Sequence, residues 1–141
     1  MGTDDARKRL TSARVATLAT AGRSGETDLV PITFAVSGNR LVSVVDHKPK
    51  TTTRLRRLEN IVGNPRVAVL AHGYDEDWDL LWWVRVRGDA RTVTSGRGHR
   101  DAVRSLVAKY AQLVDPPPIG SVIIVEIDEW LGWSARRLHE G

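Results

Sequence analysis

The chain has 141 residues, of which 41% are hydrophobic, and its 21 Lys and Arg residues outnumber 17 Asp and Glu residues. That much apolar sequence supports one hydrophobic core, so a single domain over residues 1–141 is expected. The absence of cysteine excludes disulfide bonds and thiolate metal sites. No apolar run reaches the roughly 18 residues of a spanning helix, and the N-terminal sequence lacks the apolar stretch of a signal peptide. These features predict a soluble cytoplasmic protein with no membrane partner.

One helix and three strands are expected in the first part of the chain. The helix covers Thr3 to Ser12, because Asp4 and Asp5 then lie in its first turn, where the helix dipole favours carboxylates. The strands are expected over 14–20, 27–36 and 40–46, with turns at 21–25 and 37–39. Pro31 interrupts the second strand, and since proline cannot donate to a ladder, it marks a sheet edge or a bulge.

Two helices and three strands are expected in the remainder. Leu55, Leu58 and Val62 recur at helical spacing and predict a helix over 51–63. A second helix is expected over 97–113, with inward side chains at Val103, Leu106, Val107 and Tyr110. The strands are expected over 66–72, 80–94 and 121–129, the second with a bulge or bend at Gly88 and the third continuing toward Ala135.

The number and spacing of these elements indicate the fold class. Six short strands at hairpin spacing, with helices inserted between them, predict a closed or half-closed antiparallel β-barrel, an α+β fold. Strands and helices do not alternate as in a parallel sheet, and neither a G-x-G-x-x-G fingerprint nor a Walker loop is present. The usual nucleotide-binding folds are therefore excluded.

Cations crowd the segment HKPKTTTRLRR, which runs from the end of one expected strand into a helix. Lysine and arginine are unfavourable at the positive end of a helix dipole unless an anion compensates them. Threonine hydroxyls and free backbone N–H groups add further donors there, so the segment predicts a phosphate site. A solvated helix face is the alternative interpretation. The net charge of +4 is modest for a nucleic-acid binder, and no nucleic-acid partner is expected.

The segment LWWVRVR presents two different faces. Strand alternation places Trp83, Arg85 and Arg87 on one face and Trp82, Val84 and Val86 on the other. The second face is suited to a core. The first suits a planar anionic ligand or a subunit interface. An ordinary half-exposed barrel strand, with arginine stacked on tryptophan, is the alternative.

The sequence offers no metal centre and no catalytic nucleophile. Its histidines, at positions 47, 72, 99 and 139, do not form a metal-ligand spacing with one another or with carboxylates. No serine lies in a G-x-S-x-G elbow. We therefore assign neither a metal ligand nor a catalytic residue.

The order RVATLAT, DLVPITFAV, RLVSVVD and HKPKTTTRLRRLENIVGNPRVAVL resembles the pyridoxamine-phosphate-oxidase-like family. The segments HKPK, RLRRLENI, NPRVAVL, YDEDW and LLWWVRVRG resemble its actinobacterial branch of probable F420-dependent enzymes. The likeness covers essentially the whole chain. It implies a six-stranded antiparallel split β-barrel of the FMN-binding type.

The resemblance also implies a homodimer with two cofactor sites, each built from both chains. It places the cofactor ring beside the strand around Pro31 and the phosphate on Arg57, where many relatives have lysine. It assigns Trp83 and Arg85 to the site of the partner subunit. The candidate cofactor-binding residues are Val30, Pro31, Ile32, Thr33, Asp46, Lys48, Lys50, Thr51, Arg54, Arg56, Arg57, Trp83 and Arg85.

The implied function is an F420 (deazaflavin)-dependent oxidoreductase that moves a hydride between reduced F420 and a small organic substrate. The cofactor carries the chemistry, so no acid or base is demanded of the protein. F420 has a phosphodiester and a polyglutamate tail, and the spread of cations from Lys48 to Arg57 favours it over FMN. The alternatives are an FMN-dependent oxidoreductase on the same fold, a non-catalytic flavin- or deazaflavin-binding protein, and a nucleic-acid binder using the same basic patch.

Overall fold

The computed structural model describes residues 1–45, 52–114, 117–118 and 120–135, and the side chains of 52–55 are also outside the description. Its helices are α1 (Thr3–Ser12), α2 (Thr52–Gly63) and α3 (Gly96–Lys109), with short 3-10 turns η1 (Trp78–Leu80) and η2 (Ala111–Leu113). Its strands are β1 (Ala16–Ala21), β2 (Thr27–Ile32), β3 (Ala35–Ser37), β4 (Arg40–Val44), β5 (Arg66–Gly73), β6 (Trp82–Val93) and β7 (Val122–Ser134).

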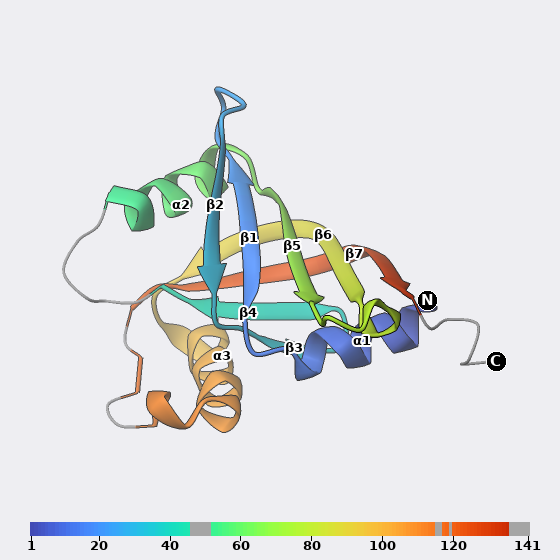
Figure 1. Ribbon diagram of the computed structural model, residues 1–141. Coiled ribbons are helices and arrows are strands. Elements are labelled where there is room, and N and C mark those ends of the chain that lie inside the picture. Colours follow the sequence, from blue (N-terminus) through green and yellow to red (C-terminus); the bar gives the residue numbers. More distant parts are fainter. Residues whose placement is uncertain (46–51, 115–116, 119, 136–141) are drawn as a thin grey trace.

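These strands form one antiparallel sheet in the order β2-β1-β5-β6-β7-β4-β3. The sheet curls into a half-barrel, with β2, β1 and β5 in front of β6, β7 and β4 in Figure 1. The predicted antiparallel α+β barrel is confirmed, with seven strands in place of six. The additional strand arises because the segment expected as one strand over 27–36 forms β2 and β3, which lie at opposite edges of the sheet. Pro31 lies in the edge strand β2, as predicted.

The main core fills the inside of the half-barrel. It includes Leu18, Phe34, Val69, Val84, Val86, Ile123 and Val125, together with Ala6 and Leu10 of α1. Full burial of each of the Val, Leu, Ile and Phe side chains stabilises the fold by roughly 1.5–3 kcal/mol relative to exposure. On the other side of the sheet, Ala102 and Leu106 of α3 pack on Val42 and Ile124. Figure 1 shows α3 against β3 and β4 and α2 at the far end of the barrel.

The buried face of α2 differs by one residue from the predicted face. Val62 is 76% exposed, whereas Ile61 is 3% exposed and belongs to the core. Leu58 and Ile61, three residues apart, face the barrel, and Asn60 is buried beside them. The grouping of Val62 with Leu58 on one helical face was wrong, because spacings of three and four both continue such a face.

A bulge in the β6–β7 pair decides which side chains of β7 face outward. The register passes from Arg87↔Glu129 to Gly88↔Ile127, which leaves Asp128 as an additional residue on β7. Before the bulge, Ile123, Val125 and Ile127 face the core. Because one residue is inserted, the odd-numbered residues after the bulge turn to the outer face. The bulge predicted at Gly88 is thus confirmed.

Much of the outer face of the sheet is left uncovered within one protomer. Helix α3 packs on β3, β4 and the first part of β7. Beyond it, Leu29, Leu70, Leu131 and Trp133 are 67%, 41%, 44% and 38% exposed. None of the described helices is long and apolar enough to cross a bilayer.

Candidate cofactor site

The register of the sheet aligns five strands into a row on this outer face. Thr17 of β1 lies opposite Pro31 of β2 and Leu70 of β5. Leu70 in turn lies opposite Arg85 of β6, which lies opposite Leu131 of β7. Side chains of such cross-strand partners stand side by side. An arginine is therefore held among apolar neighbours on a rigid sheet.

The next row forms an aromatic hollow. His72, Trp83 and Trp133 are cross-strand neighbours on β5, β6 and β7. With neighbouring residues they surround an open cavity of about 570 Å³, which we call the aromatic hollow. Its lining residues are Leu70, His72, Gly73, Tyr74, Leu81, Trp82, Trp83, Arg85 and Trp133. Flat apolar walls with one guanidinium suit a planar ring that carries negative charge.

Arg85 retains free donors toward the hollow. Glu129 accepts a hydrogen bond of 2.6 Å from Arg87, whereas its contact with Arg85 is longer, at 3.6 Å. The carboxylate is therefore engaged mainly by Arg87. A guanidinium has five N–H donors, so Arg85 can still bind a ligand oxygen.

The second group of candidate residues lies where β2 meets α2. Asp28 of β2 accepts a hydrogen bond of 2.8 Å from Asn60 and forms an ion pair of 3.5 Å with Arg56. Asn60 also donates to Thr20 at 3.0 Å, so a buried amide fixes α2 against β1 and β2. The described first turn of α2 contains no acidic residue that would neutralise its basic character.

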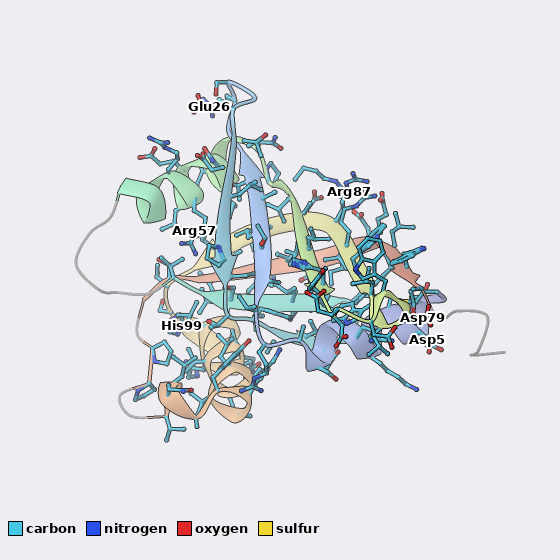
Figure 2. The ribbon with its side chains drawn as sticks, in the orientation of Figure 1. Asp5, Glu26, Arg57, Asp79, Arg87 and His99 are labelled. Carbon is cyan, nitrogen blue, oxygen red and sulfur yellow. The ribbon has the colours of Figure 1, made fainter. Side chains whose placement is uncertain are left out.

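Arg57 is half-buried, and its Nε atom has no exposed surface. In Figure 2 its side chain extends from α2 toward the region where β2 ends. We refer to Pro31, Thr33, Arg56 and Arg57 together as the β2–α2 half-site.

The four candidate residues at the C-terminal end of β2, residues 30–33, alternate between the outer side of the sheet and its core side. Pro31 and Thr33 are exposed, whereas Val30 is half-buried and Ile32 is 5% exposed within the core. The carbonyl of Thr33 accepts a 2.7 Å hydrogen bond from the Ser43 hydroxyl, which fixes the backbone there. Only Pro31 and Thr33 therefore present side chains to a ligand.

Several of the predicted residues cannot be placed. Four of them, Asp46, Lys48, Lys50 and Thr51, lie outside the described residues, and Arg54 lies in α2 but its side chain is outside the description. The contribution of the basic segment before α2 stays a prediction.

One protomer does not bring the two groups together. Pro31 and Arg85 share a face and a row, but β1 and β5 lie between their strands. Three interstrand spacings separate them by about 14 Å. The aromatic hollow and the β2–α2 half-site are thus two separate surfaces on one side of the sheet.

Sequence reasoning missed Leu70, His72, Tyr74 and Trp133 as lining residues of the hollow. A signal for two of them was present, because alternation in RVAVLAH places Leu70 and His72 on the face opposite the buried valines. No comparable signal exists for Trp133, since its orientation depends on the bulge.

Comparison with solved structures finds the same fold in several bacterial proteins. The conserved hypothetical protein Rv2991 from Mycobacterium tuberculosis has a TM-score of 0.75 and 22% identity, over 99% of this chain and 88% of that one. A FAD-binding protein from Mesorhizobium loti has a TM-score of 0.71 and 22% identity, over 94% of each chain. HutZ, the heme storage protein from Vibrio cholerae, has a TM-score of 0.69 and 11% identity, over 93% and 90%.

At these identities the structural likeness shows the fold alone. A search of curated protein sequences finds no match. The sequence pattern of one family, described as pyridoxamine 5'-phosphate oxidase, matches residues 3–134, which is nearly the whole chain. The curled antiparallel sheet agrees with that match. The chain therefore belongs to the pyridoxamine 5'-phosphate oxidase family.

Proposed function

We propose that this protein is an F420-dependent oxidoreductase that works as a homodimer, with each cofactor held between the aromatic hollow of one chain and the β2–α2 half-site of the other. The observation that carries the proposal is the division of the candidate residues into two half-sites on one uncovered sheet face. A single protomer offers the ring surface and the phosphate surface about 14 Å apart.

A twofold dimer would cover the exposed apolar face and would also bring the two separated half-sites together. The outer face exposes Leu29, Leu70, Leu131 and Trp133, and contiguous apolar patches of this kind mark interaction surfaces. In a face-to-face twofold pair, both subunits bury the same surface patch, and each contact from one residue to another across the interface occurs twice. A twofold axis between the two half-sites brings each hollow over the partner subunit's half-site.

The described residues fit the chemistry of a deazaflavin. The apolar walls of the hollow suit a planar ring, and Arg85 suits the negative charge of its reduced form. Arg56 and Arg57 lie in α2, whose first turn contains no acidic residue, which suits a phosphodiester. When bound, F420 supplies the hydride transfer, as its deazaflavin ring accepts or donates two electrons.

The protein's own part in the reaction is orientation and the exclusion of water. Trp83 and Trp133 would fix the plane of the ring, because they are held on adjacent strands. Arg85 of one chain would hold the edge of the ring, while Arg57 of the other chain would anchor the phosphate end of the cofactor. Substrate would enter on the ring face that the hollow leaves open.

Parallel titrations of the purified protein with F420 and FMN test the proposal through fluorescence of the cofactors and quenching of tryptophan. We expect saturable F420 binding at a stoichiometry of one per chain, with weaker FMN binding. Trp83→Phe should reduce the quenching, whereas Trp78→Phe, an exposed tryptophan outside the hollow lining, provides the matched control. Equal or tighter binding of FMN would overturn the preference for F420 and favour the FMN enzyme.

Heme binding is the second candidate function. His72 lies beside Trp83 in the hollow, and imidazole next to flat apolar walls suits a heme iron. The solved relatives include a heme storage protein. Addition of hemin should then produce a Soret shift that is lost in His72→Ala, while F420 fails to bind.

A further inference from the structure

The half-barrel has a seam where its two edges meet. Strands β2 and β3 are the opposite edges of the sheet, yet only Thr33 and Phe34 separate them in sequence. Tyr110, which follows α3, ties this seam through its hydroxyl. The hydroxyl accepts the Phe34 N–H at 3.2 Å and donates to the Arg14 carbonyl at 2.9 Å.

Lys109 places a positive charge at this seam. Its Nζ lies 3.9 Å from the centre of the Phe34 ring and 5.4 Å from that of Tyr110. The Nζ atom has no exposed surface and no hydrogen-bond partner. Desolvation, together with a smaller effect of the charge of Arg14, lowers the pKa of Lys109 to about 8. An aromatic face compensates a buried ammonium only in part.

Arg14 adds a second cation to the same ring. Its guanidinium lies 4.9 Å from the centre of Tyr110, and it donates to the Lys109 carbonyl at 3.0 Å. Among the ion pairs formed by described residues, none includes Lys109 or Arg14. Two cations therefore share one tyrosine without a carboxylate, although each raises the cost of the other.

We propose that the seam is a binding site for a ligand oxyanion, a carboxylate or a phosphate, held between Lys109 and Arg14. Lys109 is half-buried as a whole, so rotation of its outer methylenes brings Nζ to the surface. A bound oxyanion then supplies the counter-charge that the described residues lack. The site does not depend on which cofactor the hollow binds.

The alternative is that Lys109 only packs on Phe34 and binds no ligand. Thermal unfolding distinguishes this alternative from an oxyanion site. In the absence of added anions, Lys109→Met should raise the Tm by about 3 °C or more, because it removes an unpaired buried charge while keeping the apolar stem. Inorganic phosphate or glutarate, each compared with chloride at equal ionic strength, should raise the Tm of the wild type and leave that of Lys109→Met unchanged. The stronger of the two anions identifies the ligand group.

Two controls keep the test decisive. Lys8→Met removes an exposed lysine of α1 and should respond to anions like the wild type. Lys109→Arg keeps the charge and should retain the anion response, even if its packing differs. The proposal is overturned if Lys109→Met is less stable than the wild type, or if neither anion raises the wild-type Tm more than chloride does. Failure of F420 to bind would refute the proposed function without affecting this test.

Discussion

Gly88→Ala should disrupt the β6–β7 bulge that orients the hollow. A Cβ atom at Gly88 would lie 2.1 Å from the carbonyl oxygen of Glu126 and 3.0 Å from the Cα of Ile127. Both contacts are with backbone of the paired strand, so no side-chain rotation relieves them. The two strands must separate at the point where Asp128 is inserted.

The expected cost follows from the size of that overlap. Ordinary contacts of a Cβ atom begin near 3.4 Å, so the strands would have to move apart by more than 1 Å. Overpacking of this kind costs about 3 kcal/mol. For a domain of this size the corresponding fall in Tm is roughly 10 °C. The variant should also lose F420 affinity, because Leu131 and Trp133 owe their outward orientation to the bulge.

Gly98→Ala is the matched control. Its Cβ would meet only the Cδ1 of Ile124, at an ordinary distance of 3.6 Å, and the position lies inside α3. Replacing glycine by alanine in a helix gains about 1 kcal/mol, so this variant should have a raised Tm. Calorimetry of the two variants thus gives shifts of opposite sign. A Gly88→Ala protein with wild-type Tm and cofactor affinity would refute the close approach of the strands at Gly88.

Three further predictions concern the dimer interface, the stability of the protein in acid and the binding of the cofactor phosphate. Leu131→Lys places a charge on the apolar outer face and should yield a monomer of 15.6 kDa by light scattering, whereas a persistent dimer would locate the interface elsewhere. Hydrogen bonds from Arg40 and Arg91 lower the pKa of Glu126 below its usual 4.5, so its stabilising effect exists above that pH and is lost as the pH falls through the lower folded value. The Tm difference between wild type and Glu126→Gln should therefore shrink on acidification to about pH 3, and a constant difference would argue against the ion pairs. Arg57→Ala should weaken F420 binding about 10- to 150-fold, with partial recovery in Arg57→Lys, and unchanged affinity in both would favour a solvated helix face.

Strand alternation and helix periodicity predicted the parts of the fold that depend on local pattern. Val84 and Val86 are fully buried and Arg85 faces outward, as alternation required. Helix α1 has the predicted bounds, with Asp4 and Asp5 in its first turn, because the dipole preference acts within one turn. The role of Pro31 as an edge residue also followed from its missing N–H.

The remainder depends on contacts between distant segments. The inserted residue Asp128 reverses the orientation of Trp133, and no pattern in one strand specifies which residue is inserted. The seam between β2 and β3 follows from barrel closure, so the pairing of Lys109 with Phe34 was not predictable from either segment alone. The burial of Arg57 depends likewise on how α2 packs on the sheet.

Mixed dimers test the shared cofactor site most directly. Arg57→Ala and Arg85→Ala each damage both sites of their own homodimer, but a dimer of one chain of each kind has one intact site and one doubly damaged site. Equal mixing after unfolding and refolding makes half of the dimers mixed, so about one quarter of the wild-type F420 sites should reappear at wild-type affinity. If no F420 sites of wild-type affinity appear in the mixture although mixed dimers have formed, each site is built from a single chain and the shared-site account is wrong.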